Sequence, residues 1–266
     1  MSSRRVRQLL LQISAPLVVT VIVLLVWQLT VTLAEVPSIV VPSPLAVGQA
    51  LVAEASVLLN ACVQTARAAF TGLAASILVG VLTAFAFSQS ALIRSALYPY
   101  AILLQTVPII AVAPIVVIAV ERGFYGVTLI ASIISIFPII TSTTTGLLQV
   151  DPGLLELFRL NGATRWQTLW KLQLPHALPY LVSGIRIAGG AAIVGAIVGE
   201  FFVGSSLTGL GVMIERKKSG FDTDELYATV FVSTLLGVCT FALVTIIGEW
   251  VLRRFFAMSL GGQKQR

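Results

Sequence analysis

Charged residues are scarce in this chain. Asp, Glu, Lys and Arg make up 11% of its 266 residues, whereas 57% are hydrophobic. Soluble domains have about 25% charged and about 45–50% apolar residues, so this composition excludes an ordinary soluble enzyme and predicts an all-α membrane protein. At about 20 residues per span, the length accommodates about five to seven transmembrane helices.

Histidine and cysteine are almost absent. The single histidine, His176, and the two cysteines, Cys62 and Cys239, are not spaced as metal ligands. We therefore expect no metal, no disulfide and no Ser/His pair of the kind an intramembrane hydrolase needs. The phosphate-binding pattern GxxxxGK[ST] is also absent, so we expect no cofactor in this chain and ATP, if used, on another polypeptide.

The formal net charge of +6 does not indicate nucleic-acid binding. The basic residues occur in short groups beside apolar segments and form no basic face with interleaved aromatic residues. Their pattern is instead typical of charges that orient a protein in a bilayer and contact lipid headgroups.

Hydropathy predicts six membrane-spanning helices. They cover residues 15–34, 66–88, 97–120, 125–148, 178–204 and 228–252. Four prolines are expected to bend the third and fourth of these spans, namely Pro99, Pro108, Pro114 and Pro138. The hydroxyl-rich run from Thr141 to Thr145 can bond to its own helix carbonyls, with contact to a solute as the alternative.

The distribution of Lys and Arg predicts the orientation. One side would hold Arg4, Arg5, Arg7, Arg94, Arg159, Arg165, Lys171, Arg253, Arg254, Lys264 and Arg266. The other would hold Arg122, Arg216, Lys217 and Lys218 together with Glu35, Glu54, Glu121, Glu215, Asp222, Asp224 and Glu225. The excess of positive charge places both termini and the insert between spans four and five in the cytoplasm.

This insert, residues 151–179, carries clear helix signals. Asp151 before Pro152 is typical of a helix start, and Asn161-Gly162 of a left-handed stop. Leu154, Leu157 and Phe158 then share one face of this first short helix.

A second short helix is predicted to follow at once. Thr164 and Gln167 have the spacing of a capping box, and Trp166 and Trp170 lie on one face. Pro175 is expected to close this helix. Taken alone, an apolar stripe with two tryptophans also suits a helix lying on lipid headgroups.

The fifth predicted span contains small residues and two charges. Small side chains at positions including Gly195 and Gly199 allow close helix packing, and they equally suit a solute pathway. Arg186 and Glu200 lie about four turns apart on one face, too far apart to pair. Each has a pathway or gating role as one interpretation; the other is anchoring, with Arg186 snorkelling to the cytoplasmic interface and Glu200 hydrated at the outer end.

The order Glu156, Gly162-Ala163, Leu174-Pro175 and Pro179 resembles the EAA signature loop of binding-protein-dependent ABC importer permeases. Residues 66–254 are similar to the membrane domain of that superfamily, most closely to its nitrate, sulfonate and taurine branch. Importers of thiamine-pyrimidine precursors and of riboflavin also fall within that branch. The chain departs from the family where Leu157 and Phe158 replace the two alanines that name the motif.

The resemblance implies a type I importer bundle whose cytoplasmic loop docks on an ABC ATPase. Residues 1–65 would form an anchor helix and outer segment, 66–254 the transport domain and 255–266 a tail. It also implies an extracytoplasmic solute-binding protein, a second permease copy as in a homodimer, and a prokaryotic plasma membrane. The coupling residues it indicates are Glu156, Arg159, Gly162, Ala163, Trp166, Leu174, Pro175 and Pro179.

The solute is not readable from the sequence. Small organic anions such as sulfonate, taurine or nitrate, and small heterocycles, remain alternatives. An ion-coupled secondary transporter is the rival function, although the chain shows no inverted repeat and few intramembrane carboxylates.

Overall fold

The computed structural model describes residues 3–120, 123–203 and 208–256, and these residues are nearly all helical, with no strand among them. The helices are α1 (Ser3–Leu33), α2 (Pro44–Ala53), α3 (Ala55–Gln89), α4 (Ala91–Thr106), α5 (Ile109–Val120), α6 (Phe124–Leu148), α7 (Pro152–Leu160), α8 (Arg165–Thr168), the π-helical turn η1 (Leu169–Gln173), α9 (Leu174–Val203), α10 (Leu210–Gly220) and α11 (Thr223–Phe256). Glu121, Arg122, Lys264, Arg266 and most of the predicted 255–266 tail lie outside the described residues.

Four helical runs are long and apolar enough to cross a membrane. They are Ala55–Gln89, Phe124–Leu148, Arg165–Phe202 and Thr223–Arg254. The α4–α5 pair qualifies as a fifth if it forms one broken span. The apolar part of α1 is shorter, Leu17–Leu33, and coincides with the first predicted span. The all-helical membrane fold expected from composition is therefore confirmed.

The third predicted span, 97–120, is broken at Pro108, one of the prolines expected to bend it. α4 and α5 meet at an angle of 95°. Val107 is extended, with φ −69° and ψ 124°, because it precedes Pro108, whose ring disfavours the helical conformation of the residue before it. Pro99, Pro114 and Pro138 are instead accommodated inside helices.

The chain divides into two compact units, Met1–Leu59 with Met213–Val232 and Asn60–Val212 with Ser233–Arg266. In the first unit, Val47, Ala50 and Ala228 are buried together, and the rings of Trp27 and Tyr227 lie 6.1 Å apart. Lys217 there pairs with Glu225, and this hydrogen bond raises the pKa of the Lys217 ammonium.

The second unit is built around the α6–α9 pair. Its core joins α3, α5, α6 and α9, with a partly buried contribution from α11. The buried members are Ala68, Ala69, Leu73, Ala113, Val116, Val127, Ile130, Ala131, Ile139, Ala188, Ala192, Ile193 and Ala196. Many of these are alanines, which permit the close backbone approach typical of membrane bundles.

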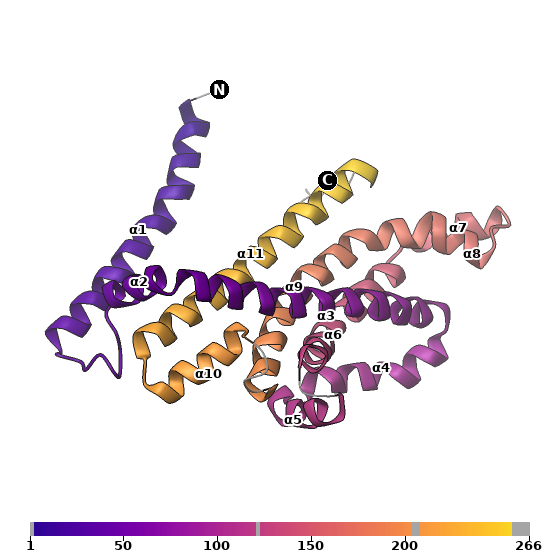
Figure 1. Ribbon diagram of the computed structural model, residues 1–266. Coiled ribbons are helices and arrows are strands. Elements are labelled where there is room, and N and C mark those ends of the chain that lie inside the picture. The colour runs from indigo at the N-terminus through magenta and orange to yellow at the C-terminus, as the bar shows by residue number, and fades with distance from the viewer. Residues whose placement is uncertain (1–2, 121–122, 204–207, 257–266) are drawn as a thin grey trace. The chain divides into compact units, whose positions relative to one another are not determined.

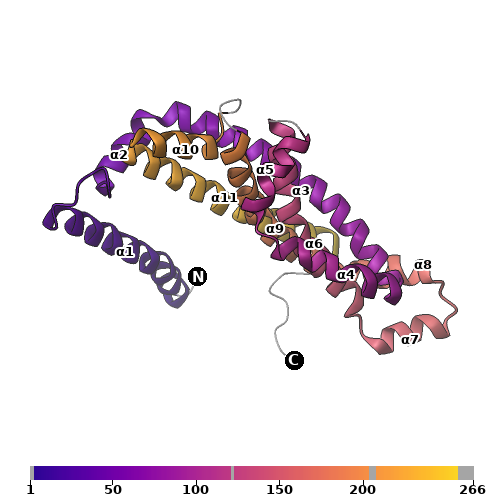
Figure 2. The ribbon, with the colours of Figure 1, turned by 90° about the horizontal axis from the view of Figure 1, so that it is seen from below.

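Hydroxyl groups add polar contacts between α3 and α6. Ser76 and Ser135 share a hydrogen bond of 2.8 Å, and Ser132 donates to the Gly72 carbonyl at 3.0 Å. In both views, α7 and α8 lie at the end of this unit where α3 ends and α4 begins (Figures 1 and 2). The predicted insert is thus presented at one end of the membrane bundle.

Candidate functional site

The first half of the insert forms α7 as the local signals predict. The Asp151 carboxylate accepts the backbone N–H groups of Gly153 at 2.7 Å and Leu154 at 3.3 Å, and Pro152 occupies the first turn. Gly162 ends the helix with φ +69°, a left-handed conformation that side chains with a Cβ rarely adopt. The predicted start and stop are both confirmed.

The surface of α7 is open. No residue of this helix is buried, and Leu154, Leu157 and Leu160 are 46, 53 and 79% exposed. Glu156 and Arg159 are also exposed, so α7 is an amphipathic helix and far too short to span a bilayer. Its leucines form an apolar stripe that the described part of this chain leaves uncovered.

The second half of the insert begins with the predicted capping box. The Gln167 N–H donates to Thr164 Oγ1 at 3.2 Å, and Gln167 Oε1 accepts the Thr164 N–H at 2.9 Å. Trp166 and Trp170 pack edge to face with centroids 6.1 Å apart, and both rings are largely exposed.

The prediction that Pro175 closes this helix is wrong. α8 continues through η1 into α9, so Arg165–Phe202 is one helical run of 38 residues. In η1 the Leu174 N–H bonds to the carbonyl of Leu169, five residues back. Leu174 and Pro175 then lie in the first turn of α9, where proline is tolerated, and Pro179 lies inside α9.

The segment from η1 to the start of α9 packs against α3 and α6. Leu169 and Ala177 are buried with Ala84 of α3 and Leu147 of α6. His176 Nδ1 lies 2.9 Å from the Gly146 carbonyl, and the Tyr180 hydroxyl donates to Gln149 at 3.0 Å. Sequence reasoning missed this contact of His176.

A polar cavity of about 550 Å³ separates the insert from the end of α3. Its walls come from α3, α7, α8 and η1. The lining residues are Ser88, Gln89, Leu155, Arg159, Ala163, Arg165, Thr168 and Gln173. Of the predicted coupling residues, Arg159 and Ala163 therefore face the α3 end, whereas Glu156 and Trp166 are exposed.

Gly195 and Gly199 lie where α9 touches α6. A Cβ at Gly195 would meet the Cα of Ala131 at 2.8 Å, and one at Gly199 would meet the Cα of Val127 at 3.1 Å. Both glycines are buried in this contact. The tight-packing interpretation thus has direct geometric support.

Glu200 is 2% exposed, so the interpretation of a hydrated outer carboxylate is wrong. The Thr65 hydroxyl lies 2.9 and 3.0 Å from its two oxygens, and the Gly211 N–H donates to it at 2.7 Å. The Leu210 N–H in turn donates to Thr65 Oγ1 at 2.8 Å. The carboxylate therefore ties α3 and α9 to the first turn of α10, where a negative charge is favourable.

Two glycines make room for this carboxylate. A Cβ at Gly209 would collide with the carboxylate itself, and one at Gly211 would meet the Glu200 Cβ at 2.8 Å. Sequence reasoning missed these partners. The Gly209-Leu210-Gly211 pattern, which begins one residue before α10, was the available signal for a close backbone approach to an anion.

Arg186 lies in α9 without a described ion pair. Its guanidinium carbon is 5.2 Å from the centre of the Phe241 ring of α11, and its buried Nε has no hydrogen-bond partner. Arg186 and Glu200 are thus held by separate neighbours, as their spacing predicted.

Comparison with known proteins identifies the family. Residues 76–257 match the family described as "Binding-protein-dependent transport system inner membrane component". A "Probable ABC transporter permease protein" of Haemophilus influenzae is 31% identical over 240 residues, covering 90% of this chain and 96% of the relative. The "Riboflavin transport system permease protein RibX" of Chloroflexus aurantiacus is 31% identical over 240 residues, covering 88% of each chain.

The fold is shared with a solved transporter. A chain from the MetNI methionine ABC transporter, in inward-facing conformations, superposes with a TM-score of 0.53 at 23% identity, covering 74% of this chain and 93% of that one. Fold, family match and relatives agree with the resemblance in the 151–179 loop. The chain therefore belongs to the inner-membrane permease family of binding-protein-dependent ABC importers and has the type I permease fold.

Proposed function

We propose that residues 151–179 couple this permease to a separate ABC ATPase on the cytoplasmic side. The family match supports this role, since a chain without a phosphate-binding loop needs a nucleotide-hydrolysing partner that supplies the ATP and Mg²⁺ sites. The uncovered apolar stripe of α7 and the exposed Trp166 provide the docking surface. Glu156 adds a charged contact at its edge.

The continuity of α8, η1 and α9 is the observation that carries this proposal. Arg165–Phe202 is one helical run. A displacement of α8 at its start, next to the proposed docking surface, is therefore transmitted directly to the membrane span formed by α9. Closure of two ATPase subunits around ATP would then tilt α9 together with α6, against which it packs along several glycines. Alternating access is the expected result.

The complete transporter is proposed to contain two copies of this chain. Two ATPase subunits close around ATP, and each needs one coupling loop. The family description further supports an extracytoplasmic binding protein that delivers the solute. The Lys and Arg distribution supports cytoplasmic termini in the plasma membrane of a prokaryote.

Arg186 is proposed to face the solute pathway. Gly195, Gly199 and Glu200 lie in the same helix, α9, and are proposed to belong to the same pathway segment. An arginine inside a bilayer, held by one aromatic ring and with an unpartnered Nε, favours a solute that carries negative charge. A small organic anion such as a sulfonate fits this charge. A small heterocycle is the alternative, because one relative is named for riboflavin.

Substitution of Gly162 tests the coupling role. Gly162→Val forces a β-branched residue into φ +69° at a cost of roughly 1–2 kcal/mol, although no atom lies within 4 Å of the added Cβ. We expect the variant to insert normally but to lose co-purification with the cognate ATPase. Gly162→Asn is the matched control, since asparagine tolerates this conformation.

Two results would overturn the coupling role. One is equal ATPase binding by both Gly162 variants and the native chain. The other is solute accumulation against a gradient by the purified chain reconstituted alone, which would indicate an ion-coupled secondary transporter.

The pathway role of Arg186 needs a separate measurement. Thermal-shift screening of the cognate binding protein first identifies the solute. We then expect Arg186→Ala to reduce uptake of an anionic solute by about tenfold or more, and Arg186→Lys to retain part of it. Unchanged uptake in Arg186→Ala would leave only the anchoring role.

A further inference from the structure

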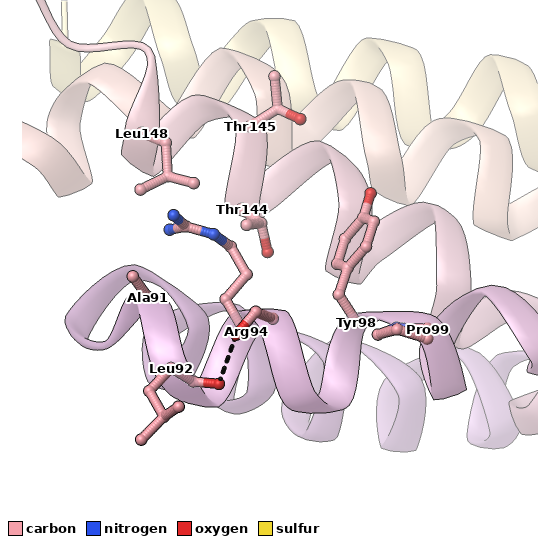
Figure 3. Close-up of a pocket in the computed structure, with 9 residues that line it drawn as sticks. Ala91, Leu92, Arg94, Tyr98, Pro99, Thr144, Thr145 and Leu148 are labelled. Atoms are coloured by element: carbon pink, nitrogen blue, oxygen red, sulfur yellow. Dashed lines mark hydrogen bonds between the residues drawn. The ribbon is translucent and has the colours of Figure 1, made fainter.

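A second cavity lies between the first turns of α4 and the last turns of α6 (Figure 3). Its volume is about 780 Å³, within the usual range of small-molecule sites. The lining residues are Ala91, Leu92, Arg94, Ser95, Tyr98, Pro99, Thr144, Thr145 and Leu148. It shares no lining residue with the polar cavity of the insert.

Arg94 provides the positive charge of this cavity. Its half-buried side chain extends from α4 toward α6, with the guanidinium near Leu148 (Figure 3). One nitrogen donates to the Phe87 carbonyl at 3.3 Å, and none of the described ion pairs includes Arg94. A guanidinium has five N–H donors, so most of its hydrogen-bonding capacity is available to a ligand.

Thr144 provides an unsatisfied hydroxyl on the opposite wall. The residue is 4% exposed, and its Oγ1 has no hydrogen-bond partner in the described part of the chain. Thr141 of the same helix behaves differently, because its hydroxyl donates to the Phe137 carbonyl at 3.0 Å. A buried hydroxyl without a partner costs about 1–3 kcal/mol, which an acceptor on a bound molecule would recover.

The start of α4 adds a third positive feature. Ala91 and Leu92 line the cavity, and they form the first turn of a 16-residue helix. The Ser90 cap accepts only the Ile93 N–H, at 3.3 Å, so the first two N–H groups of the helix have no cap acceptor. Unpaired N–H groups at a helix start favour anions.

We propose that this cavity binds an oxyanion attached to a partly apolar body, with Arg94 and Thr144 as the direct ligands. Leu92, Pro99 and Leu148 give the body an apolar wall beside the polar groups. A phosphate or sulfonate group satisfies these donors equally well. It can come from an anionic phospholipid of the bilayer or from a soluble solute, and the proposal does not depend on the coupling role of the insert.

The test measures binding to the detergent-purified full chain by native mass spectrometry and by thermal unfolding. Phosphatidylglycerol probes the lipid source against phosphatidylcholine, and 1-propanesulfonate probes the soluble source. The two ligand variants are Arg94→Gln and Thr144→Val. Arg216→Gln is the control, because it removes the same charge from an exposed position on α10.

We expect the native chain to bind one probe selectively, and Arg94→Gln to weaken this binding by about tenfold or more. Thr144→Val should weaken it by about fivefold or more while leaving the melting temperature of the ligand-free chain equal or higher, since it removes an unsatisfied hydroxyl. Arg216→Gln should bind as the native chain does. Selective binding of phosphatidylglycerol identifies a lipid site, and selective binding of 1-propanesulfonate identifies a soluble ligand.

Two outcomes would overturn the proposal. The first is absence of selective binding of either probe by the native chain. The second is a lowered melting temperature of Arg94→Gln with unchanged binding, which would show that Arg94 serves only the hydrogen bond to the Phe87 carbonyl of α3.

Discussion

α7 and α9 lie close together in the sequence but are stabilised in opposite ways. α7 is defined by its own ends, the Asp151 cap and the left-handed Gly162, and buries none of its residues. α9 is defined by its neighbours, since Gly195 and Gly199 touch α6 and Glu200 bonds to α3 and α10.

Because of this difference, substitutions in α7 and in α9 are expected to have different consequences for stability. A substitution on the exposed face of α7 leaves the packing of this chain intact and would affect only the proposed contact with the ATPase. A substitution on the buried face of α9 changes the bundle itself. Exposed positions usually change stability by less than about 0.5 kcal/mol, whereas buried clashes and lost buried hydrogen bonds cost several times more.

The largest effect is expected for Gly195→Val. The added side chain must overlap the Ala131 backbone of α6, so the helices have to separate, at a cost of about 1–3 kcal/mol or more. A lowered melting temperature and reduced recovery of the folded chain are the expected results. Gly190→Ala is the matched control in the same helix, because its Cβ would meet nothing within 4 Å. Equal stability of the two variants would contradict the packing role.

Glu200→Ala should have an effect of comparable size. It leaves the buried Thr65 hydroxyl and the Gly211 N–H without their acceptor, at a cost of about 1–3 kcal/mol for each group left unpaired. Glu200→Gln retains one acceptor oxygen and should be less destabilised. Thermal unfolding of both variants measures this order, and the reverse order would show that the hydrogen bonds contribute little.

The smallest effect on stability is expected for Leu157→Gln on α7. The side chain is 53% exposed, so the melting temperature should remain close to that of the native chain. Co-purification with the ATPase should nevertheless fall, because the apolar stripe is interrupted. Val52→Gln is the control, since Val52 is an exposed apolar residue outside the insert. Undiminished ATPase binding by Leu157→Gln would contradict the proposal that α7 serves in binding whereas α9 serves in packing.

Local sequence signals predicted the insert well. The Asp151-Pro152 start, the Asn161-Gly162 stop and the Thr164 capping box depend on residues at most a few positions apart. Composition and hydropathy likewise predicted the helical membrane fold, because a bilayer imposes both length and apolarity.

Features that depend on distant residues were not predicted. Thr65 and Glu200 are 135 positions apart, and no periodicity links them. Pro175 is a common stop signal, but the π-helical turn before it places the proline in a first turn without closing the helix. The expected bend at Pro108 is confirmed, but its size of 95° was not predicted.

The π-helical turn also fixes a rotational phase. Five residues complete a hydrogen-bonded loop in η1 where four would suffice in an α-helix, so the chain carries one surplus residue there. Each residue corresponds to about 100° of rotation and about 1.5 Å of rise. Deleting one residue from η1 would rotate Trp166 and Trp170 by about 100° around the axis of α9. The single extra residue in η1 therefore determines the direction in which Trp166 and Trp170 point relative to α9.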